Sequence, residues 1–206
     1  MSEFLAISLL IILAAISPGP DFAMVVKNSL MYSRRAGTFT ALGVAVSLLI
    51  HSTYCILGLA IIISESLLAF SIIKYVGAAY LIYIGIKSLL AKREIKNIDS
   101  SHLSHAVLND WPAFRQGLLC NLLNPKAIMF LLAFFTLVVK PGSSLTSELG
   151  YGLEIALIHA IWFSFLAYIL THHYVKANIS KVQFYIVKVM GAVLVAFGIR
   201  IAMLQQ

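Results

Sequence analysis

Charged side chains are scarce in this chain of 206 residues: they make up 11% of it, whereas hydrophobic residues make up 61%. Globular domains in water carry about 25% charged residues. Residues 36–64 and 155–175 contain no Asp, Glu, Lys or Arg, and the mean hydropathy is +0.95. A membrane-spanning helix needs about 20 mostly apolar residues. The composition therefore argues against an ordinary water-soluble domain and predicts an integral membrane protein.

The residue patterns of common catalytic and metal sites are also missing. The two cysteines, Cys55 and Cys120, lie within apolar runs and do not form a C-x-x-C pair. No glycine-rich phosphate-binding loop, no metal-ligand spacing and no nucleophile–base pair stands out. We therefore expect no enzyme activity, no cofactor and no metal site. The N-terminal apolar run lacks a preceding basic segment, so we also expect no cleaved secretory signal.

The apolar runs predict an all-α polytopic membrane protein with six transmembrane helices. The chain has only one sizeable polar linker, residues 91–115, and leaves no room for a soluble domain. We therefore expect a single transmembrane domain over residues 1–206. The six predicted spans cover approximately residues 4–26, 39–63, 68–90, 116–139, 150–172 and 183–204.

Basic residues gather in alternate linkers between these spans. Lys and Arg concentrate in cytoplasmic loops of membrane proteins. The distribution therefore places the 91–115 loop in the cytoplasm and both termini outside. The net charge of +7 then reflects topology and contact with anionic membrane lipid, and nucleic acid is not an expected partner. The cytoplasmic set holds Lys27, Arg34, Arg35, Lys87, Lys92, Arg93, Lys96, Arg115, Lys176 and Lys181, against Lys74, Lys140 and Arg200 on the other side.

The two halves of the chain resemble each other. Three pairs of segments match in the same order, at offsets of 105 to 114 residues: KYVGAAYLIYIGIK with KVMGAVLVAFGIR, PDFAM with PKAIM, and GVAVSLLIHS with GLEIALIHA. We expect one repeat over about 1–90 and a second over about 116–206. Because each repeat has three spans, the second must insert upside down relative to the first. Such inverted repeats are common among secondary transporters.

Proline interrupts the first helix of each predicted repeat. Residues 17–22 read SPGPDF, so Pro18, Gly19 and Pro20 break the first span, and Pro125 breaks the fourth. Proline lacks a backbone N–H and clashes with the preceding turn. The freed backbone groups are tolerated in a membrane only when they are buried in protein or line a wet cavity. Matching breaks in two inverted halves therefore predict a substrate site.

A charged residue follows each break. Asp21 and Lys126 each cost about 2.5–3.5 kcal/mol near the middle of a membrane, so each should face the interior and find a partner. An amino acid carries both complementary charges: Asp21 suits its ammonium group, and Lys126 with Asn124 suits its carboxylate. Ser17 and Asn121 are further candidate contacts. The alternative is a structural ion pair, or side chains that reach to the membrane interface.

Three further residues are candidate proton carriers. His51 and His159 occupy matching places in the second helix of each repeat, and Glu154 precedes His159 in the fifth span. Histidine titrates near physiological pH, which favours a proton relay. The alternative for both histidines is a hydrogen-bonded interior side chain without a role in proton transfer.

Several of these motifs resemble the LysE/RhtB family of bacterial amino-acid exporters. They are SPGPDF at the end of the first span, RRAG at Arg34–Gly37 and NPKAIMF in the fourth span. The family's SPGP and NPK motifs match Ser17–Pro20 and Asn124–Lys126. The resemblance covers nearly the whole chain. It implies a bacterial inner-membrane protein of about six helices that exports amino acids or their derivatives, driven by a proton or ion gradient.

The small number of intramembrane carboxylates narrows the expected substrate. A dibasic amino acid should require a second acidic partner, and only Asp21 and Glu154 are candidates. We therefore expect a neutral substrate such as threonine or homoserine. The alternative is an exporter of a cation or another small solute, although a cation exporter should show a cage of carboxylates. A face of small residues would allow a homodimer, but no feature requires one.

Overall fold

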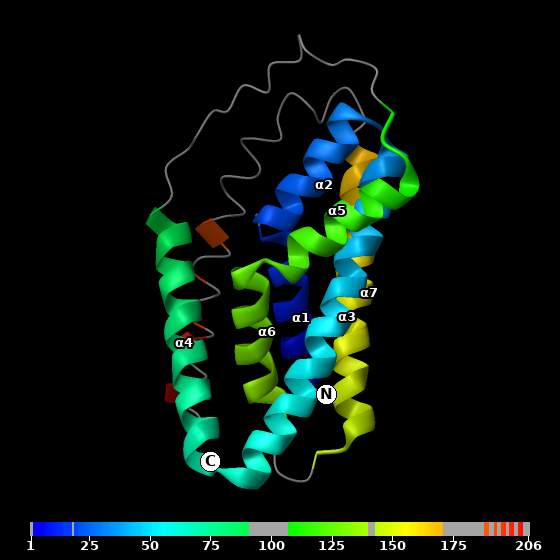
Figure 1. The fold of residues 1–206 in the computed structure, drawn as a ribbon. Helices are drawn as coiled ribbons and strands as arrows, with labels where there is room; N and C mark the ends of the chain where they lie inside the picture. Colours follow the sequence, from blue (N-terminus) through cyan, green and yellow to red (C-terminus); the bar gives the residue numbers. More distant parts are fainter. Residues whose placement is uncertain are drawn as a thin grey trace.

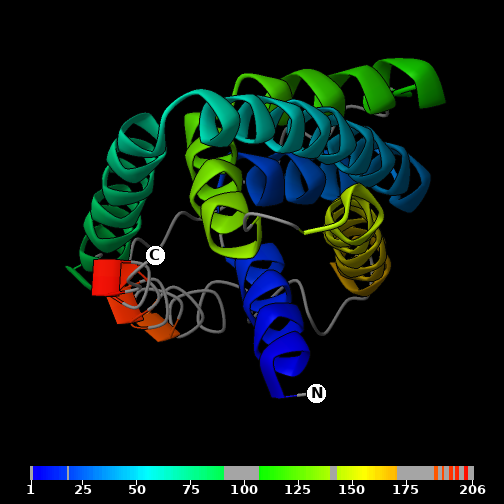
Figure 2. The same cartoon turned by 90° about the horizontal axis from the view of Figure 1, so that it is seen from below.

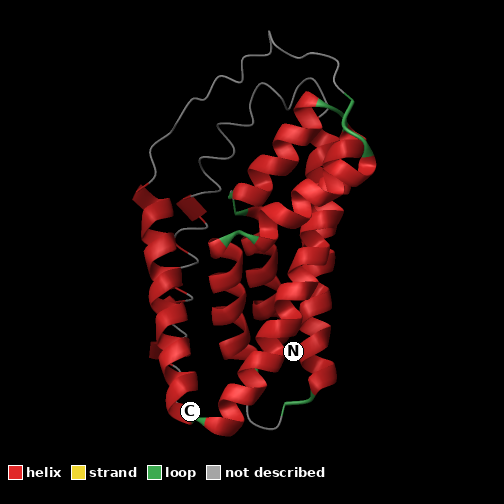
Figure 3. Ribbon diagram, viewed as in Figure 1, coloured by secondary structure: helices red, strands yellow, loops and turns green. Residues whose placement is uncertain are grey.

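A computed structural model describes residues 2–17, 19–90, 107–139 and 143–170, together with single helical positions between Lys188 and Met203. These residues form helices joined by short turns, with no strand among them (Figure 3). The helices are α1 (Ser2–Ile16), α2 (Pro20–Met31), α3 (Arg34–Glu65), α4 (Leu67–Leu90), α5 (Asp110–Leu122), α6 (Pro125–Val138) and α7 (Leu145–Leu170).

The described helices are long and apolar enough for two to four membrane spans. Arg34–Leu59 of α3 and the whole of α7 each qualify alone. The pairs α1–α2 and α5–α6 each qualify as one bent span, with bends of 53° and 61°. The prediction of an all-helical membrane protein is therefore confirmed, and both expected helix breaks are present.

Helix ends near the basic linkers differ from the predicted bounds. Helix α2 continues to Met31, α3 begins at Arg34, and α5 begins at Asp110, so the end of the expected 91–115 loop is helical. Polar residues at these ends extend each helix beyond its apolar stretch, which hydropathy alone does not detect. Lys74, which the charge count assigned to the outer side, lies within α4 as the predicted span 68–90 implies, and it is buried.

Two predicted segments lie largely or wholly outside the described residues. The loop from residue 91 to residue 106 is not described. Of the sixth predicted span, 183–204, only single helical positions between Lys188 and Met203 are described. The six-helix arrangement of two inverted repeats therefore remains a prediction.

Helix α3 is central to the described bundle. It packs against α5, α7 and α2 (Figure 1). Helices α2 and α5 form the upper half of Figure 1, and α1 and α6 form the lower half beneath the two breaks. Helix α4 lies at the periphery and packs against α6, as the view from below also shows (Figure 2). The two helix breaks therefore lie inside the bundle at similar depth.

Two glycines allow α3 and α5 to cross closely. A Cβ added to Gly43 of α3 would collide with the carbonyl oxygen of Phe114. A Cβ added to Gly117 of α5 would collide with the carbonyl oxygen of Thr40. Small residues permit this backbone approach in membrane helices. The crossing holds α5, and with it one of the two breaks, against α3.

Polar contacts join α2, α3 and α5 above the breaks. Asn28 is fully buried in α2, and its Nδ2 donates to Thr40 Oγ1 at 2.8 Å and to Gln116 Oε1 at 3.1 Å. Nearer the helix starts, Arg35 binds Asp110 through Nε and Nη2 at 2.8 and 2.7 Å. The second pair is exposed, so its contribution to stability is small. Together these contacts fix α2 and α5 relative to α3.

Candidate functional site

The second helix of each bent pair begins with proline. Pro20 opens α2 and Pro125 opens α6, at a position where a missing N–H costs no helical hydrogen bond. Gly19 is the N-cap of α2 and provides no side-chain cap. Pro18 lies outside the described residues. The prolines therefore act as helix starts, and they direct the N-terminal ends of α2 and α6 into the bundle.

Asn124 connects the two breaks. Its Oδ1 accepts a hydrogen bond from the backbone N–H of Lys126 at 3.0 Å and so caps α6. Its Nδ2 donates to Asp21 Oδ2 at 2.9 Å. Because the oxygen must face the N–H and the nitrogen must face the carboxylate, both contacts agree on one orientation of the amide. The residue before Pro125 is thus tied to the residue after Pro20.

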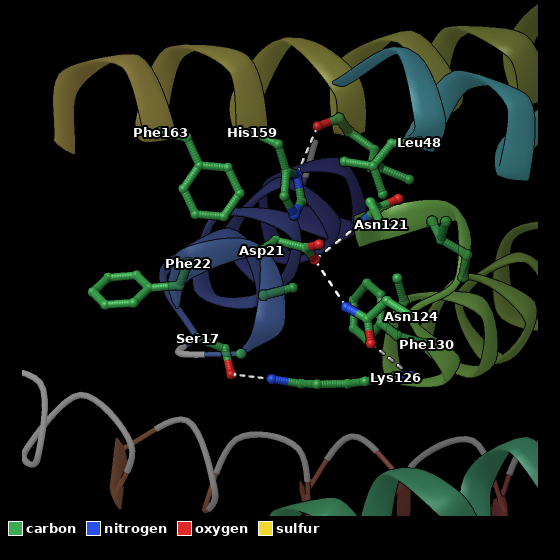
Figure 4. A pocket seen from close by; sticks show the side chains of 15 residues that line it. Ser17, Asp21, Phe22, Leu48, Asn121, Asn124, Lys126, Phe130, His159 and Phe163 are labelled. Atoms are coloured by element: carbon green, nitrogen blue, oxygen red, sulfur yellow. Dashed lines mark hydrogen bonds between the residues drawn. The ribbon is translucent and has the colours of Figure 1, made fainter. Parts of the chain in front are cut away.

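Asp21 is the centre of this polar cluster (Figure 4). Its Oδ2 also accepts a hydrogen bond from Asn121 Nδ2 at 3.0 Å. Its Oδ1 is buried and accepts no such bond within the described parts of the chain, although the weakly donating thiol of Cys120 lies beside the carboxylate. Asn121 Oδ1 is likewise buried and unpartnered there. Two buried acceptor oxygens are therefore left for a donor.

Lys126 belongs to the same polar cluster and lies beside Ser17 and Gly19. Its Nζ donates to Ser17 Oγ at 2.8 Å, across the break between α1 and α2 (Figure 4). The ammonium lies beside Gly19, where an added Cβ would be 3.5 Å from Nζ. Lys126 therefore lies in van der Waals range of the N-cap of α2.

These polar groups border a small cavity of about 50 Å³. A single water needs roughly 10–15 Å³ by this measure, so the cavity holds only a few waters. Its apolar walls come from five different helices. The lining side chains outside the polar cluster include Phe22, Leu48, Phe130, Leu131, Ile155 and Phe163 (Figure 4).

His159 contributes to the cavity wall from α7. Its Nδ1 lies 2.8 Å from the carbonyl oxygen of Ile155, one turn earlier in the helix. Because a carbonyl only accepts, Nδ1 carries the hydrogen and donates it. In the neutral ring Nε2 is then an acceptor, available for a proton or for a donor in the cavity.

His51 is not among the residues that line the cavity, and both of its ring nitrogens have hydrogen-bond partners. Nε2 is 3.2 Å from the carbonyl oxygen of Asn121, and Nδ1 contacts the hydroxyl of Tyr54. Nε2 must donate to the carbonyl, so Nδ1 accepts from Tyr54 in the neutral ring. The ring is 2% exposed. His51 therefore holds the end of α5 from which Asn121 reaches Asp21.

Glu154 is not among the residues that line the cavity. Its Oε1 accepts a hydrogen bond from Ser8 Oγ at 2.6 Å, which joins α7 to α1. No group of three or more His, Cys, Asp or Glu side chains suited to a metal ion occurs within the described ranges.

The predicted contact residues therefore come together, whereas the aromatic wall was not predicted. Ser17, Asp21, Asn121, Asn124 and Lys126 all border one cavity. In a uniformly apolar sequence, hydropathy does not distinguish a phenylalanine that lines a cavity from one that faces lipid. Two positional signals were available: Phe22 follows Asp21, and Phe163 lies one helical turn after His159.

Comparison with known proteins identifies the family. The model of the LysE type translocators matches residues 12–205. The chain belongs to the LysE translocator family. This family consists of transporters rather than enzymes, so the prediction that the protein is not an enzyme is confirmed.

Several known proteins are similar to this LysE-family chain over nearly its full length. The chain is 34% identical to the uncharacterized membrane protein YrhP of Bacillus subtilis, over 97% of this chain and 98% of that protein. It is 30% identical to the uncharacterized membrane protein YahN of Escherichia coli, over 93% and 85% of the two chains. The threonine efflux protein of Escherichia coli is 26% identical over 96% of both chains. No solved structure matches.

Proposed function

We propose that this LysE-family translocator exports a small neutral amino acid or derivative, similar to threonine or homoserine, across the bacterial inner membrane. One observation carries the proposal: a carboxylate with an unpartnered buried oxygen and a lysine ammonium border the same cavity, at the starts of α2 and α6. The distant relationship to threonine efflux proteins supports the same substrate class.

The substrate ammonium binds at Asp21. Among the described residues that line the cavity, Asp21 Oδ1 and Asn121 Oδ1 are the two buried oxygens without a hydrogen-bond donor. A buried unpaired acceptor costs free energy, and an ammonium group offers three donors to remove that cost. Asn121 and Asn124 hold the carboxylate through Oδ2, so its Oδ1 remains directed to the substrate.

The substrate carboxylate binds between Lys126 and the N-terminus of α2. The first backbone N–H groups of α2 have no partners within the helix, and Gly19 offers no side-chain cap. A helix N-terminus favours a negative charge. In this arrangement, the substrate carboxylate binds the Lys126 ammonium next to the Ser17 hydroxyl, which accepts a hydrogen bond from the same ammonium.

The substrate side chain lies against the apolar wall. Phe22, Phe130 and Phe163 line this wall, and among the described residues that line the cavity Asp21 is the one carboxylate. A second positive charge on the substrate would have no partner there, and burying an unpaired charge is expensive. This composition supports a neutral substrate over a dibasic one.

Transport proceeds by alternating access, because the cavity of about 50 Å³ is too small for an amino acid without side-chain or helix movement. We take the chain to be one transmembrane domain of six spans in two inverted repeats, with both termini outside and the 91–115 linker in the cytoplasm. The equivalent bends of α1–α2 and α5–α6, at 53° and 61°, support this symmetry. The repeats then move against each other around the fixed site.

Export is coupled to the proton gradient, with His159 as the favoured carrier of the proton. Its Nε2 is left as an acceptor, and the ring lines the cavity. Glu154 is bound to Ser8 outside the cavity lining, and both ring nitrogens of His51 already have partners. These contacts make Glu154 and His51 weaker candidates.

Ligands that lack one charge test the binding mode. Hydrogen bonds to charged groups contribute about 1.5–3 kcal/mol, so Asp21→Asn and Lys126→Gln should each weaken threonine binding by roughly tenfold or more. The decarboxylated amine should be insensitive to Lys126→Gln, and the deaminated acid insensitive to Asp21→Asn. Titration calorimetry of the purified protein measures all combinations, with the remote surface variant Asp110→Asn as the matched control.

A different pattern favours the second candidate function, export of a cation or another small solute. If sodium or potassium binds at Asp21 and no amino acid does, the site is a cation site. If Asp21→Asn binds threonine as tightly as the wild type, the carboxylate does not receive the ammonium and the proposed binding mode is wrong.

A further inference from the structure

A second, basic groove lies at the start of α3, away from the cavity at the helix breaks. It has a volume of about 500 Å³ and shares no lining residue with that cavity. One wall comes from the first turns of α3 and the other from the last turns of α7. Its lining residues are Arg34, Arg35, Thr38, Phe39, Ser164 and Tyr168.

The groove carries a net positive charge. Arg34 stacks on the ring of Tyr168, with its guanidinium carbon 4.8 Å from the ring centroid. Because the ring is uncharged, this contact does not neutralise the positive charge of Arg34. Arg35 has an exposed side chain and shares its charge with Asp110 through two of its five N–H groups. Arg34 and Arg35 carry two positive charges, and Asp110 carries one negative charge. One positive charge and several guanidinium N–H donors therefore remain to bind an anion.

The groove also adjoins exposed apolar surface. On α3, Leu42 and Val46 are exposed and follow Arg35 and Phe39 along one helix face at intervals of three or four residues. On α7, Ile161 and Phe165 are exposed on the face that leads to Tyr168. Because α3 and α7 pack together, these two apolar faces flank the groove.

We propose that this groove binds the headgroup of an anionic phospholipid. The phosphate lies between the guanidinium groups of Arg34 and Arg35, and Ser164 and Thr38 line the polar floor beside it. The acyl chains follow the exposed apolar faces of α3 and α7. A free phosphate would use the arginines but not these faces, so a lipid fits the whole surface. Basic grooves at the ends of membrane helices are suited to such headgroups.

Lipid binding to the purified, delipidated full-length protein tests this proposal. Native mass spectrometry with phosphatidylglycerol and phosphatidylcholine of the same acyl chains should show at least tenfold tighter binding of the anionic lipid. Arg34→Gln should remove most of this preference, whereas Arg34→Lys should retain much of it because the charge remains. Arg115→Gln removes an exposed arginine of α5 that does not line the groove, and should leave the preference unchanged.

Three outcomes would overturn the proposal. Equal binding of the two lipids would show that the groove does not recognise an anionic headgroup. An unchanged preference in the folded double variant Arg34→Gln/Arg35→Gln would place the lipid elsewhere. Competition by soluble glycerol phosphate, as effective as competition by phosphatidylglycerol, would identify a phosphate site without a lipid component. Thermal unfolding of each variant in detergent verifies that it is folded.

Discussion

Asp21 combines a buried charge with an incomplete set of hydrogen bonds. Oδ2 accepts from Asn121 and Asn124, whereas Oδ1 accepts from no N–H or O–H donor in the described chain. A purely structural carboxylate at this depth would be expected to have both oxygens satisfied. The unsatisfied oxygen beside the cavity, together with the Lys126 ammonium, supports the proposal of a ligand that carries a positive and a negative group.

His51 provides a prediction at the residue scale. His51→Gln retains an N–H that can reach the Asn121 carbonyl, whereas His51→Leu leaves that contact unmade. We expect His51→Leu to weaken substrate binding by about fivefold, in line with a hydrogen bond of about 1 kcal/mol, and His51→Gln to restore most of it. Titration calorimetry measures the affinities.

The pH response of transport separates this positioning role from a proton relay. Efflux by His51→Gln should respond to an imposed pH gradient as the wild type does, because the contact to Asn121 needs no proton transfer. If the variant binds substrate normally but no longer responds to the gradient, His51 carries the proton and the positioning role is wrong. His159→Gln is the comparison variant, because His159 lines the cavity and forms its hydrogen bond within the described residues through Nδ1, not Nε2.

At the scale of single helices, the crossing of α3 and α5 depends on glycine. Gly117→Ala places a methyl group against the Thr40 carbonyl, whereas Gly58→Ala meets no atom within 4 Å. Alanine is otherwise better than glycine in a helix by about 1 kcal/mol. We therefore expect Gly117→Ala to lower the melting temperature in detergent and Gly58→Ala to leave it unchanged or raise it.

Scanning fluorimetry of the two purified variants measures this difference. The two substitutions have the same chemistry, so only the surroundings of each position differ. A melting temperature that is equal in both variants, or higher in Gly117→Ala, would contradict the close crossing of α3 and α5.

The helix breaks could be predicted from the sequence because their cause is local. Pro20 and Pro125 cannot donate a backbone hydrogen bond in any environment, so the chain must restart a helix there. The grouping of Asp21 with Asn121 and Asn124 could be expected only from the internal repeat, because about 100 residues separate the partners. Their hydrogen-bond geometry required the structure.

Other features had no distinctive sequence pattern. Phe22, Phe130 and Phe163 face the cavity, yet exposed Phe165 and Leu157 on α7 are equally apolar. Lipid and protein interior favour the same side chains, so hydropathy does not separate the two environments. The helical start at Asp110 was missed for a related reason: the first turns of α5 are polar or mixed and resemble a loop.

At the scale of the whole molecule, the basic residues indicate an orientation in the membrane. In Figure 1 the start of α3, the start of α5 and the end of α4 all lie toward the upper end of the bundle. Arg34 and Arg35 are the first two residues of α3, and Lys87 lies in the last turn of α4. On the positive-inside rule, we propose that this end faces the cytoplasm. Labelling from the two sides of the membrane tests this orientation.

Cysteine labelling provides that test. In a Cys55→Ala/Cys120→Ala background, Ser2→Cys should react with a membrane-impermeant maleimide on intact spheroplasts. Ser101→Cys, within the 91–115 linker, should react only after the membrane is permeabilised. The opposite pattern would reverse the proposed topology and, with it, the expected direction of transport.

Efflux from proteoliposomes is the most direct test of the central claim, that this LysE-family protein exports a neutral amino acid through the Asp21 site. The vesicles are loaded with a mixture of labelled amino acids and compared with and without an imposed pH gradient, for the wild type and for Asp21→Asn. We expect a few neutral amino acids to leave selectively, faster with the gradient, and only through the wild-type protein. If no amino acid leaves through folded wild-type protein, or if Asp21→Asn transports as fast, the central claim is wrong.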